Sequence, residues 1–144
     1  MSTFSYPATV KIDSAGFHLV TFPDVPEVGT DAETREEALE ESVDSLIAAL
    51  GAYIHARRAI PKPSKAKRGQ MIVALPTLVS AKLALYAALR EAEVSNVELG
   101  RRLGISEGAV RRLLDLDHRS HIGQVEAGLQ ALGRRLKVEV QEAA

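Results

Sequence analysis

The sequence predicts an α+β protein, in which antiparallel strands and one helix precede an all-α part that ends in a short C-terminal strand. Residues 4–12 alternate between apolar and polar side chains, as half-buried strands do, and residues 17–22 are rich in aromatic and branched side chains. Residues 34–54 and 77–93 carry apolar side chains at spacings of three and four, the period of helices with a buried face. Two shorter helical patterns follow in residues 96–115, and a strand-like segment spans residues 137–140.

The first two strands are expected to form a hairpin. Residues 4–12 and 17–22 are rich in apolar, aromatic and branched side chains, and residues 13–16 between them are Asp-Ser-Ala-Gly, which favours a tight turn. Pro7 has no amide hydrogen for a neighbouring strand, so we expect the first strand at a sheet edge or Pro7 facing solvent. Residues 24–33 are polar and leave room for a short third strand.

A long helix should begin at Thr34, whose hydroxyl can accept the Glu37 amide in a capping box. Residues 60–70 contain two prolines and four basic residues without apolar periodicity, which predicts an exposed connection. The apolar run 71–75 is expected to be a buried strand that returns to the N-terminal sheet. Acidic side chains occupy the exposed side of the helix's first half: Glu36, Glu37, Glu40, Glu41 and Asp44.

Residues 96–115 have the spacing of a helix-turn-helix. Gly100 stands where the helices would cross, Gly104 can adopt the left-handed conformation of the turn, and Ser106 can cap the second helix. Such spacing also occurs in helical hairpins that only pack or dimerise, but four arginines on the outer face favour DNA as the ligand. The apolar set expected to face inward is Leu99, Leu103, Ile105, Val110 and Leu113.

Arg111 and Arg112 are the main candidates for base contacts, because an arginine can bond both acceptors of guanine. Asn96 and Ser106 suit phosphate contacts near helix N-termini, and Glu107 can read only a cytosine amino group. Gly108 offers no group for base readout, so part of the specificity is expected from DNA shape. The predicted DNA-binding residues are Asn96, Arg101, Arg102, Ser106, Glu107, Arg111 and Arg112.

The formal net charge of −1 hides opposite charges on the two halves. Residues 1–60 carry 4 Lys/Arg against 10 Asp/Glu, a charge of −6, whereas residues 61–144 carry 14 against 9, a charge of +5. This division favours a basic partner for the first half and a polyanion for the second, although charged faces are often only solvated. We expect two domains, at residues 1–76 and 77–144.

Composition excludes several classes of function. The chain has no cysteine, which excludes disulfides, cysteine-ligated metals and thiol nucleophiles. No apolar run approaches the roughly 18 residues of a membrane span, and the N-terminus lacks the pattern of a signal peptide, so a cytoplasmic protein without membrane contact is expected. His118 and His121 have no suitable third ligand nearby, so we expect no metal or other cofactor.

Four stretches carry a resemblance to a known family. They are Phe22-Pro-Asp-Val-Pro-Glu-Val-Gly-Thr-Asp-Ala-Glu-Thr-Arg-Glu-Glu-Ala-Leu, Ile60-Pro-Lys-Pro-Ser, Leu116-Asp-His-Arg-Ser-His-Ile and Ala131-Leu-Gly-Arg-Arg-Leu-Lys-Val-Glu-Val. Together they resemble the HicB antitoxins of bacterial toxin–antitoxin systems over nearly the whole chain. The resemblance implies a partial RNase H-like N-terminal domain that binds and blocks HicA, a small mRNA-cleaving toxin. It also implies a C-terminal domain that represses the operon by binding operator DNA.

The acidic half suits this partner, because an RNA-cleaving toxin presents positive charge to its substrate. We expect toxin contacts at Asp24, Glu27 and Asp31. A homodimer or a higher even-numbered homo-oligomer is expected, since one recognition helix covers only a half-site. The residues expected to pair across the dimer are those of the terminal strand: Lys137, Val138, Glu139 and Val140.

Two other functions stay open at this point. An RNase H-like domain is a nuclease when carboxylates converge on two metal ions, and Asp13, Asp24 and Asp31 are the candidates. They are expected in turns and loops, whereas such a site needs ligands fixed on strands and helices, so solvated acids are favoured. The other function is a repressor whose N-terminal domain senses a small ligand, for which the sequence has no signal beyond that domain.

Overall fold

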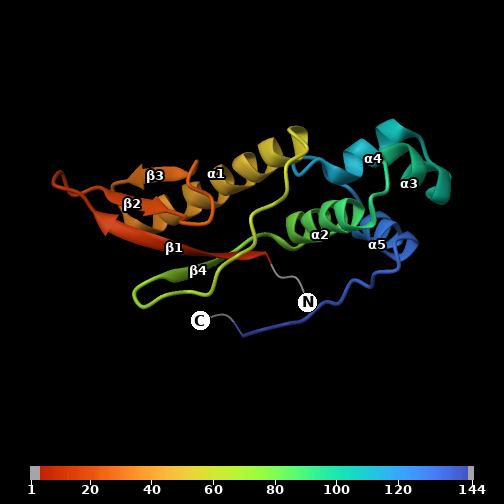
Figure 1. The fold of residues 1–144 in the computed structure, drawn as a ribbon. Coiled ribbons are helices and arrows are strands. Elements are labelled where there is room, and N and C mark those ends of the chain that lie inside the picture. Colours follow the sequence, from red (N-terminus) through yellow and green to blue (C-terminus); the bar gives the residue numbers. More distant parts are fainter. Residues whose placement is uncertain (1–3, 143–144) are drawn as a thin grey trace.

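The computed structural model describes residues 4–142, in which a sheet and one helix pack beside a group of four helices (Figure 1). The α+β class is confirmed. No helix in this range is both long and apolar enough to cross a membrane. The elements in chain order are β1 (Ser5–Ile12), β2 (His18–Thr21), β3 (Gly29–Ala32), α1 (Arg35–His55), β4 (Met71–Ala74), α2 (Thr77–Ala92), α3 (Asn96–Leu103), α4 (Glu107–Leu114) and α5 (Ile122–Ala131).

β1 lies inside the antiparallel sheet, whose strand order is β3-β2-β1-β4. Both alternatives predicted for Pro7 are wrong, because β1 is not an edge strand and Pro7 is buried rather than facing solvent. The first half of β1, Ser5–Ala8, pairs with β4, and the second half, Thr9–Ile12, pairs with β2. Pro7 lies opposite Ile72 of β4 and beyond the end of the β2 ladder. The strand thus has one neighbour at this point, and a residue without an amide hydrogen is tolerated there.

One face of the sheet packs against α1 (Figure 1). The helix begins as predicted, with the Thr34 hydroxyl accepting the Glu37 amide at 3.2 Å. β4 returns to the sheet as expected, but Ile72 is 53% exposed, so the prediction of a buried strand is wrong. An edge strand with one open face alternates in exposure along its length. The main fully buried side chains between sheet and helix are Tyr6, Val20, Phe22, Leu46 and Leu50.

The connection between α1 and β4 is anchored at two points, although its basic side chains are exposed as predicted. The Tyr6 hydroxyl donates to the Pro61 carbonyl oxygen at 2.8 Å, and burial raises the pKa of Tyr6. The Asp24 carboxylate accepts the Ser64 amide at 2.8 Å and its hydroxyl at 3.0 Å. These bonds join residues 55 and 40 positions apart, so local patterns do not predict them.

α2 links the two hydrophobic clusters of the molecule. Val79 and Leu83 pack with the sheet and α1, whereas Leu85 packs with the other helices. The Tyr86 hydroxyl donates to the Arg58 carbonyl oxygen at 2.7 Å, just beyond the end of α1. α2 therefore holds the helical part against the sheet part.

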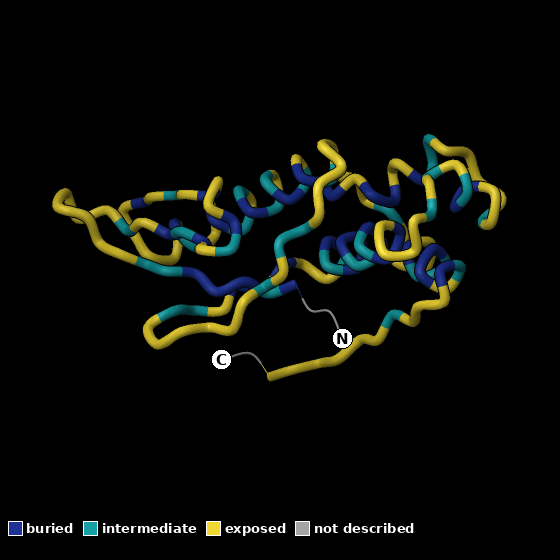
Figure 2. Tube along the Cα trace, in the orientation of Figure 1, coloured by how far each residue is buried: buried dark blue, intermediate teal, exposed yellow. Residues whose placement is uncertain are grey.

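The predicted C-terminal strand is absent from the described part of the chain. After α5, residues 134–142 have no regular secondary structure, and Figure 2 shows this segment as largely exposed. Val138 is 67% and Val140 is 93% exposed. A strand needs a neighbour for its amide and carbonyl groups, and within residues 4–142 no strand pairs with this segment. An alternating sequence alone cannot supply that neighbour.

Candidate nucleic-acid interface

α3 and α4 form the helix-turn-helix at the predicted positions. Gly104 adopts the left-handed conformation, with φ of +69°. A Cβ atom on Gly100 would lie 2.7 Å from the Ile105 carbonyl oxygen, so only glycine fits at the crossing. Leu99 and Val110 are fully buried between the helices, whereas Ile105 is 37% exposed and departs from the predicted apolar set. The two helices are thus held close together by packing and by backbone geometry.

Serine side chains cap both helices of the motif. The Ser106 hydroxyl oxygen accepts the Ala109 amide at 3.1 Å, as predicted. Ser95 accepts the Glu98 amide at 3.0 Å and caps α3 in the same way. Sequence reasoning missed Ser95, although serine followed three residues later by glutamate is the signal of a capping box. Each serine hydroxyl keeps its hydrogen for another acceptor, such as a phosphate oxygen.

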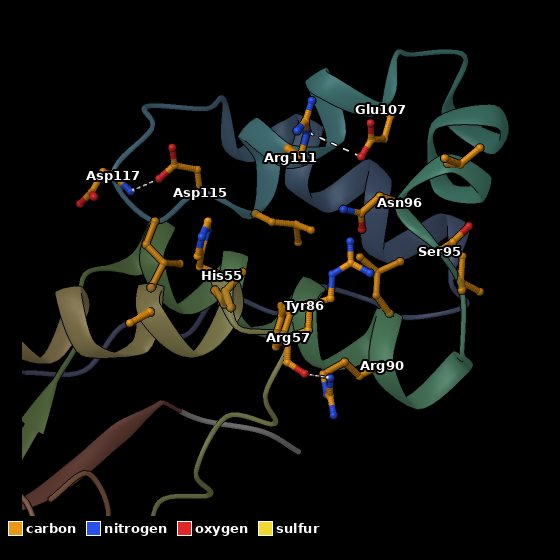
Figure 3. Close-up of a pocket in the computed structure, with 18 of the residues that line it drawn as sticks. His55, Arg57, Tyr86, Arg90, Ser95, Asn96, Glu107, Arg111, Asp115 and Asp117 are labelled. Carbon is orange, nitrogen blue, oxygen red and sulfur yellow. Dashed lines mark hydrogen bonds and ion pairs between the residues drawn. The ribbon is translucent and has the colours of Figure 1, made fainter. Parts of the chain in front are cut away.

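The guanidinium groups of Arg111 and Arg112 lie close to Gly108, which has no side chain, on α4. A Cβ atom on Gly108 would lie 3.9 Å from a terminal nitrogen of both Arg111 and Arg112. The Arg111 side chain is 67% exposed and lies 3.6 Å from the Glu107 carboxylate, one turn earlier (Figure 3). The two predicted base-reading side chains start from the last turn of α4, and their ends reach back to Gly108.

Arg101 and Arg102 share one carboxylate, that of Glu98 on α3. Arg101 bonds both oxygens of Glu98, at 2.6 and 2.8 Å, and Arg102 bonds one at 3.1 Å. These bonds lower the pKa of Glu98 to about 2, with Arg101 as the larger cause. Arg102 also donates to the Ala131 carbonyl oxygen of α5 at 3.3 Å. Arg101 stays 71% exposed, whereas Arg102, at 38%, also joins two helices.

A fully buried lysine of α2, which sequence reasoning missed, holds the C-terminal end of α4. The Lys82 Nζ donates to the carbonyl oxygens of Arg112 and Asp115 at 2.9 and 2.6 Å, and to the Ser120 hydroxyl at 2.9 Å. Cations stabilise helix C-termini, where carbonyl groups lack intrahelical partners. Burial lowers the pKa of Lys82, and the Asp115 carboxylate partly opposes this shift. Lys82 thus positions α4 from inside the protein.

The expected toxin contacts fall into two groups. The Asp24 carboxylate is hydrogen-bonded to Ser64. Glu27 accepts the Tyr53 hydroxyl at 2.6 Å, and this bond lowers the pKa of Glu27 and raises that of Tyr53. Both carboxylates therefore hold the loop between β2 and β3 to neighbouring segments. Asp31 is instead exposed on β3, the strand at the sheet edge.

A larger exposed acidic surface lies along the first half of α1. We call it the acidic face, and its residues are Glu36, Glu37, Glu40, Glu41 and Asp44. Salt bridges within residues 4–142 involve none of these five side chains. Their exposure was predicted from the sequence, but a contact with a partner was not. Their i, i+4 spacing was the available signal that they share one side of a helix.

A groove of about 1190 Å³ separates the second half of α1 from α3 and α4 (Figure 3). Asn96, Glu107 and Arg111 line it from the helix-turn-helix, whereas Arg112 lines a smaller hollow on the other side of α4. The predicted DNA-binding residues are thus spread around α4. Within residues 4–142, no three potential ligands converge on a metal position.

The fold and this geometry define a class: a helix-turn-helix protein joined to a small α+β unit with an acidic helix. Residues 5–84 match a family model described as "HicB_like antitoxin of bacterial toxin-antitoxin system". The chain is 40% identical over 141 residues to antitoxin HicB of Pseudomonas fluorescens, covering 97% of this chain and 96% of that one. It is 37% identical over 133 residues to antitoxin HicB 2 of Photorhabdus laumondii, covering 92% and 94%. It is 33% identical over 133 residues to antitoxin HicB of Escherichia coli K12, covering 92% and 96%.

The chain therefore belongs to the HicB family of antitoxins. These relatives are antitoxins rather than enzymes, which confirms the expectation of a protein without catalysis. The nuclease alternative is set aside on that ground. Two of its three candidate carboxylates are also hydrogen-bonded within the protein, since Asp13 accepts the Ala15 and Phe17 amides and Asp24 accepts Ser64.

Proposed function

We propose that this antitoxin neutralises a HicA-like mRNA-cleaving toxin with its N-terminal part and represses its own operon with its helix-turn-helix. The proposal of DNA binding rests on the pair of exposed guanidinium groups beside Gly108, on a helix whose N-terminus is capped by Ser106. The proposal of toxin neutralisation rests on membership of the HicB family. Both ligands belong to the bacterial cytoplasm, which is the location we propose.

The acidic face of α1, together with Asp31, is the surface we propose for the toxin. A protein that cleaves RNA must attract a polyanion, so its substrate-binding surface is basic. An acidic helix competes for that surface and speeds the encounter through long-range attraction. Asp24 and Glu27 have a different role in this proposal: they keep the adjacent loop in place through Ser64 and Tyr53.

For DNA we propose that Arg111 and Arg112 contact bases while residues around the helix N-termini contact phosphates. Arginine bonds guanine O6 and N7 in a geometry that the other base pairs do not offer. Ser106 and Asn96 stand at the starts of α4 and α3, where backbone amides also attract phosphate. Arg101, which is oriented by Glu98, is a further phosphate contact in this proposal. Arg102 lies beside Arg101 on the same helix, and Glu107 lies beside the base-reading Arg111.

The DNA-binding form in this proposal is a homodimer, or a higher even-numbered homo-oligomer, that reads two half-sites. The C-terminal segment supports pairing between copies, because Val138 and Val140 are exposed and alternate with Lys137 and Glu139. Such a segment gains backbone hydrogen bonds and buries its apolar side chains when a second copy pairs with it.

Replacing Arg111 and Arg112 with alanine tests this assignment. The double variant should bind a duplex from upstream of its own gene at least about 30-fold more weakly, because each lost arginine–guanine contact removes about 1–3 kcal/mol. Toxin binding should be unchanged. The matched control is Lys62→Ala with Lys65→Ala, which removes two exposed charges from the connection before β4. Equal DNA binding by the two double variants, measured by fluorescence anisotropy, would refute the assignment.

A further inference from the structure

We propose that Gly108 is a specificity-determining residue, which lets the backbone of the recognition helix approach the DNA base edges closely. This inference rests on the proposed DNA binding. It adds a role for a position that carries no base-reading group.

Three other glycines of the helical part are explained by the fold, whereas Gly123 is not. Gly104 has a left-handed backbone, and a Cβ atom on Gly100 would collide with a carbonyl oxygen. A Cβ atom on Gly128 would lie 3.0 Å from the Leu85 side chain, which is tighter than ordinary contact. Each of these positions therefore resists a larger residue for a reason within the protein itself.

Gly108 has no such reason. It lies in regular helix, and the nearest atoms to an added Cβ are three side-chain ends at 3.9 Å, an ordinary contact distance. Alanine would fit without displacing Arg111 or Arg112. Glycine is also among the least favourable residues for a helix, because its backbone loses the most conformational freedom. The fold thus carries an unfavourable residue here without a packing benefit.

Gly123 of α5 also lacks a packing reason, so it is the location of Gly108 that points to a role in recognition. Gly108 is the second residue of α4, two positions after the Ser106 cap, and a recognition helix contacts base edges with its N-terminal residues. The guanidinium groups of Arg111 and Arg112 point towards the N-terminal end of α4 and lie beside Gly108. In this conformation they reach guanine acceptors when the helix backbone itself comes close to the bases. A side chain at position 108 would stand between the backbone and the bases.

Gly123 is a matched control within the same chain. It is the second residue of α5, is exposed, and has no atom within 4 Å of an added Cβ. Gly123→Ala therefore makes the same chemical change at the same helix position, but away from the proposed base-reading face.

The experiment compares the full-length wild type, Gly108→Ala and Gly123→Ala. Thermal unfolding should show a Tm raised by about 1–3 °C in both variants, because each replaces a helical glycine. Binding is measured to a duplex from upstream of this chain's gene and to a scrambled duplex of equal composition. Only Gly108→Ala should weaken binding to the upstream duplex, by about tenfold or more, since at least one guanine contact is lost. Binding to the scrambled duplex should not change.

Each other result overturns the inference in a recognisable way. Wild-type affinity of Gly108→Ala for the upstream duplex would show that the glycine has no role in recognition. A lowered Tm in Gly108→Ala but not in Gly123→Ala would show that the glycine serves the fold. If the wild type itself does not prefer the upstream duplex to the scrambled one, the proposed DNA binding fails and this inference fails with it.

Discussion

Replacing Lys82 with methionine removes a buried cation that holds the C-terminal end of α4. Methionine has a similar length and no hydrogen-bond donor, so the main change is loss of the three bonds from Nζ. A hydrogen bond to a charged group contributes about 1.5–3 kcal/mol, but removing a buried charge recovers several kcal/mol of desolvation. The Ser120 hydroxyl still donates to the Arg112 carbonyl oxygen, and the His118 amide still donates to that of Asp115. We therefore expect a net loss about as large as the contribution of one such bond rather than of three.

The expected loss is about 2–3 kcal/mol in the free energy of unfolding, or about 5–10 °C in Tm for a chain of this length. Thermal unfolding followed by circular dichroism measures it. Lys62→Met is the control, because Lys62 is exposed and its replacement should leave Tm unchanged. Affinity for the upstream duplex should fall in Lys82→Met, since the recognition helix loses its anchor. A Tm within about 1 °C of the wild type would refute the reasoning.

Three further predictions concern separate parts of the molecule. The folded pKa of Glu98 is about 2 and its ordinary value is 4.5, so its stabilisation is complete above pH 4.5 and is lost towards pH 2. Glu98→Gln should flatten the fall of Tm over that pH range, and an equally steep fall would contradict the ion pair. Glu40→Lys with Asp44→Lys should slow toxin association in stopped-flow experiments at low salt, and the difference should shrink at high salt. Equal rates at low salt would exclude the acidic face. Truncation after Arg135 should yield monomers in light scattering, whereas a persistent dimer would exclude the C-terminal segment as the interface.

Much of the fold could be predicted because it depends on short-range patterns. The Thr34 and Ser106 caps act within three residues, and the helix-turn-helix depends on glycines and apolar residues at fixed spacing. Gly100 shows the connection most clearly, since the close approach that favours glycine there also defines the motif. Composition and spacing were sufficient for these elements.

The errors have a common physical cause, which is dependence on distant segments. In the sequence, Lys82 is a single charged residue within an apolar helix. Its three hydrogen-bond partners lie at the end of α4 and just after it, about 30–40 residues further along the chain. Asp24 reads as a loop acid, but Ser64 lies 40 residues further along the chain. Val138 belongs to an alternating pattern, yet a strand there needs a neighbour that residues 4–142 do not provide.

The charge division also required the structure for its interpretation. The acidic residues of the first 60 positions include a continuous surface on α1, but also Asp24 and Glu27, which are bonded internally. The net charge of these residues includes the exposed carboxylates and the internally bonded ones alike. It therefore predicted the sign of the partner's charge without distinguishing contact residues from loop anchors.

The central claim is that the full chain is an antitoxin for a small basic RNA-cleaving protein. The most direct measurement is co-expression of the full-length chain with the small open reading frame beside its gene, with growth and complex formation both recorded. The account predicts that the small protein alone arrests growth, that this chain restores growth, and that the two proteins are recovered together. Growth arrest that persists while the folded chain is present, with no complex recovered, would contradict the account.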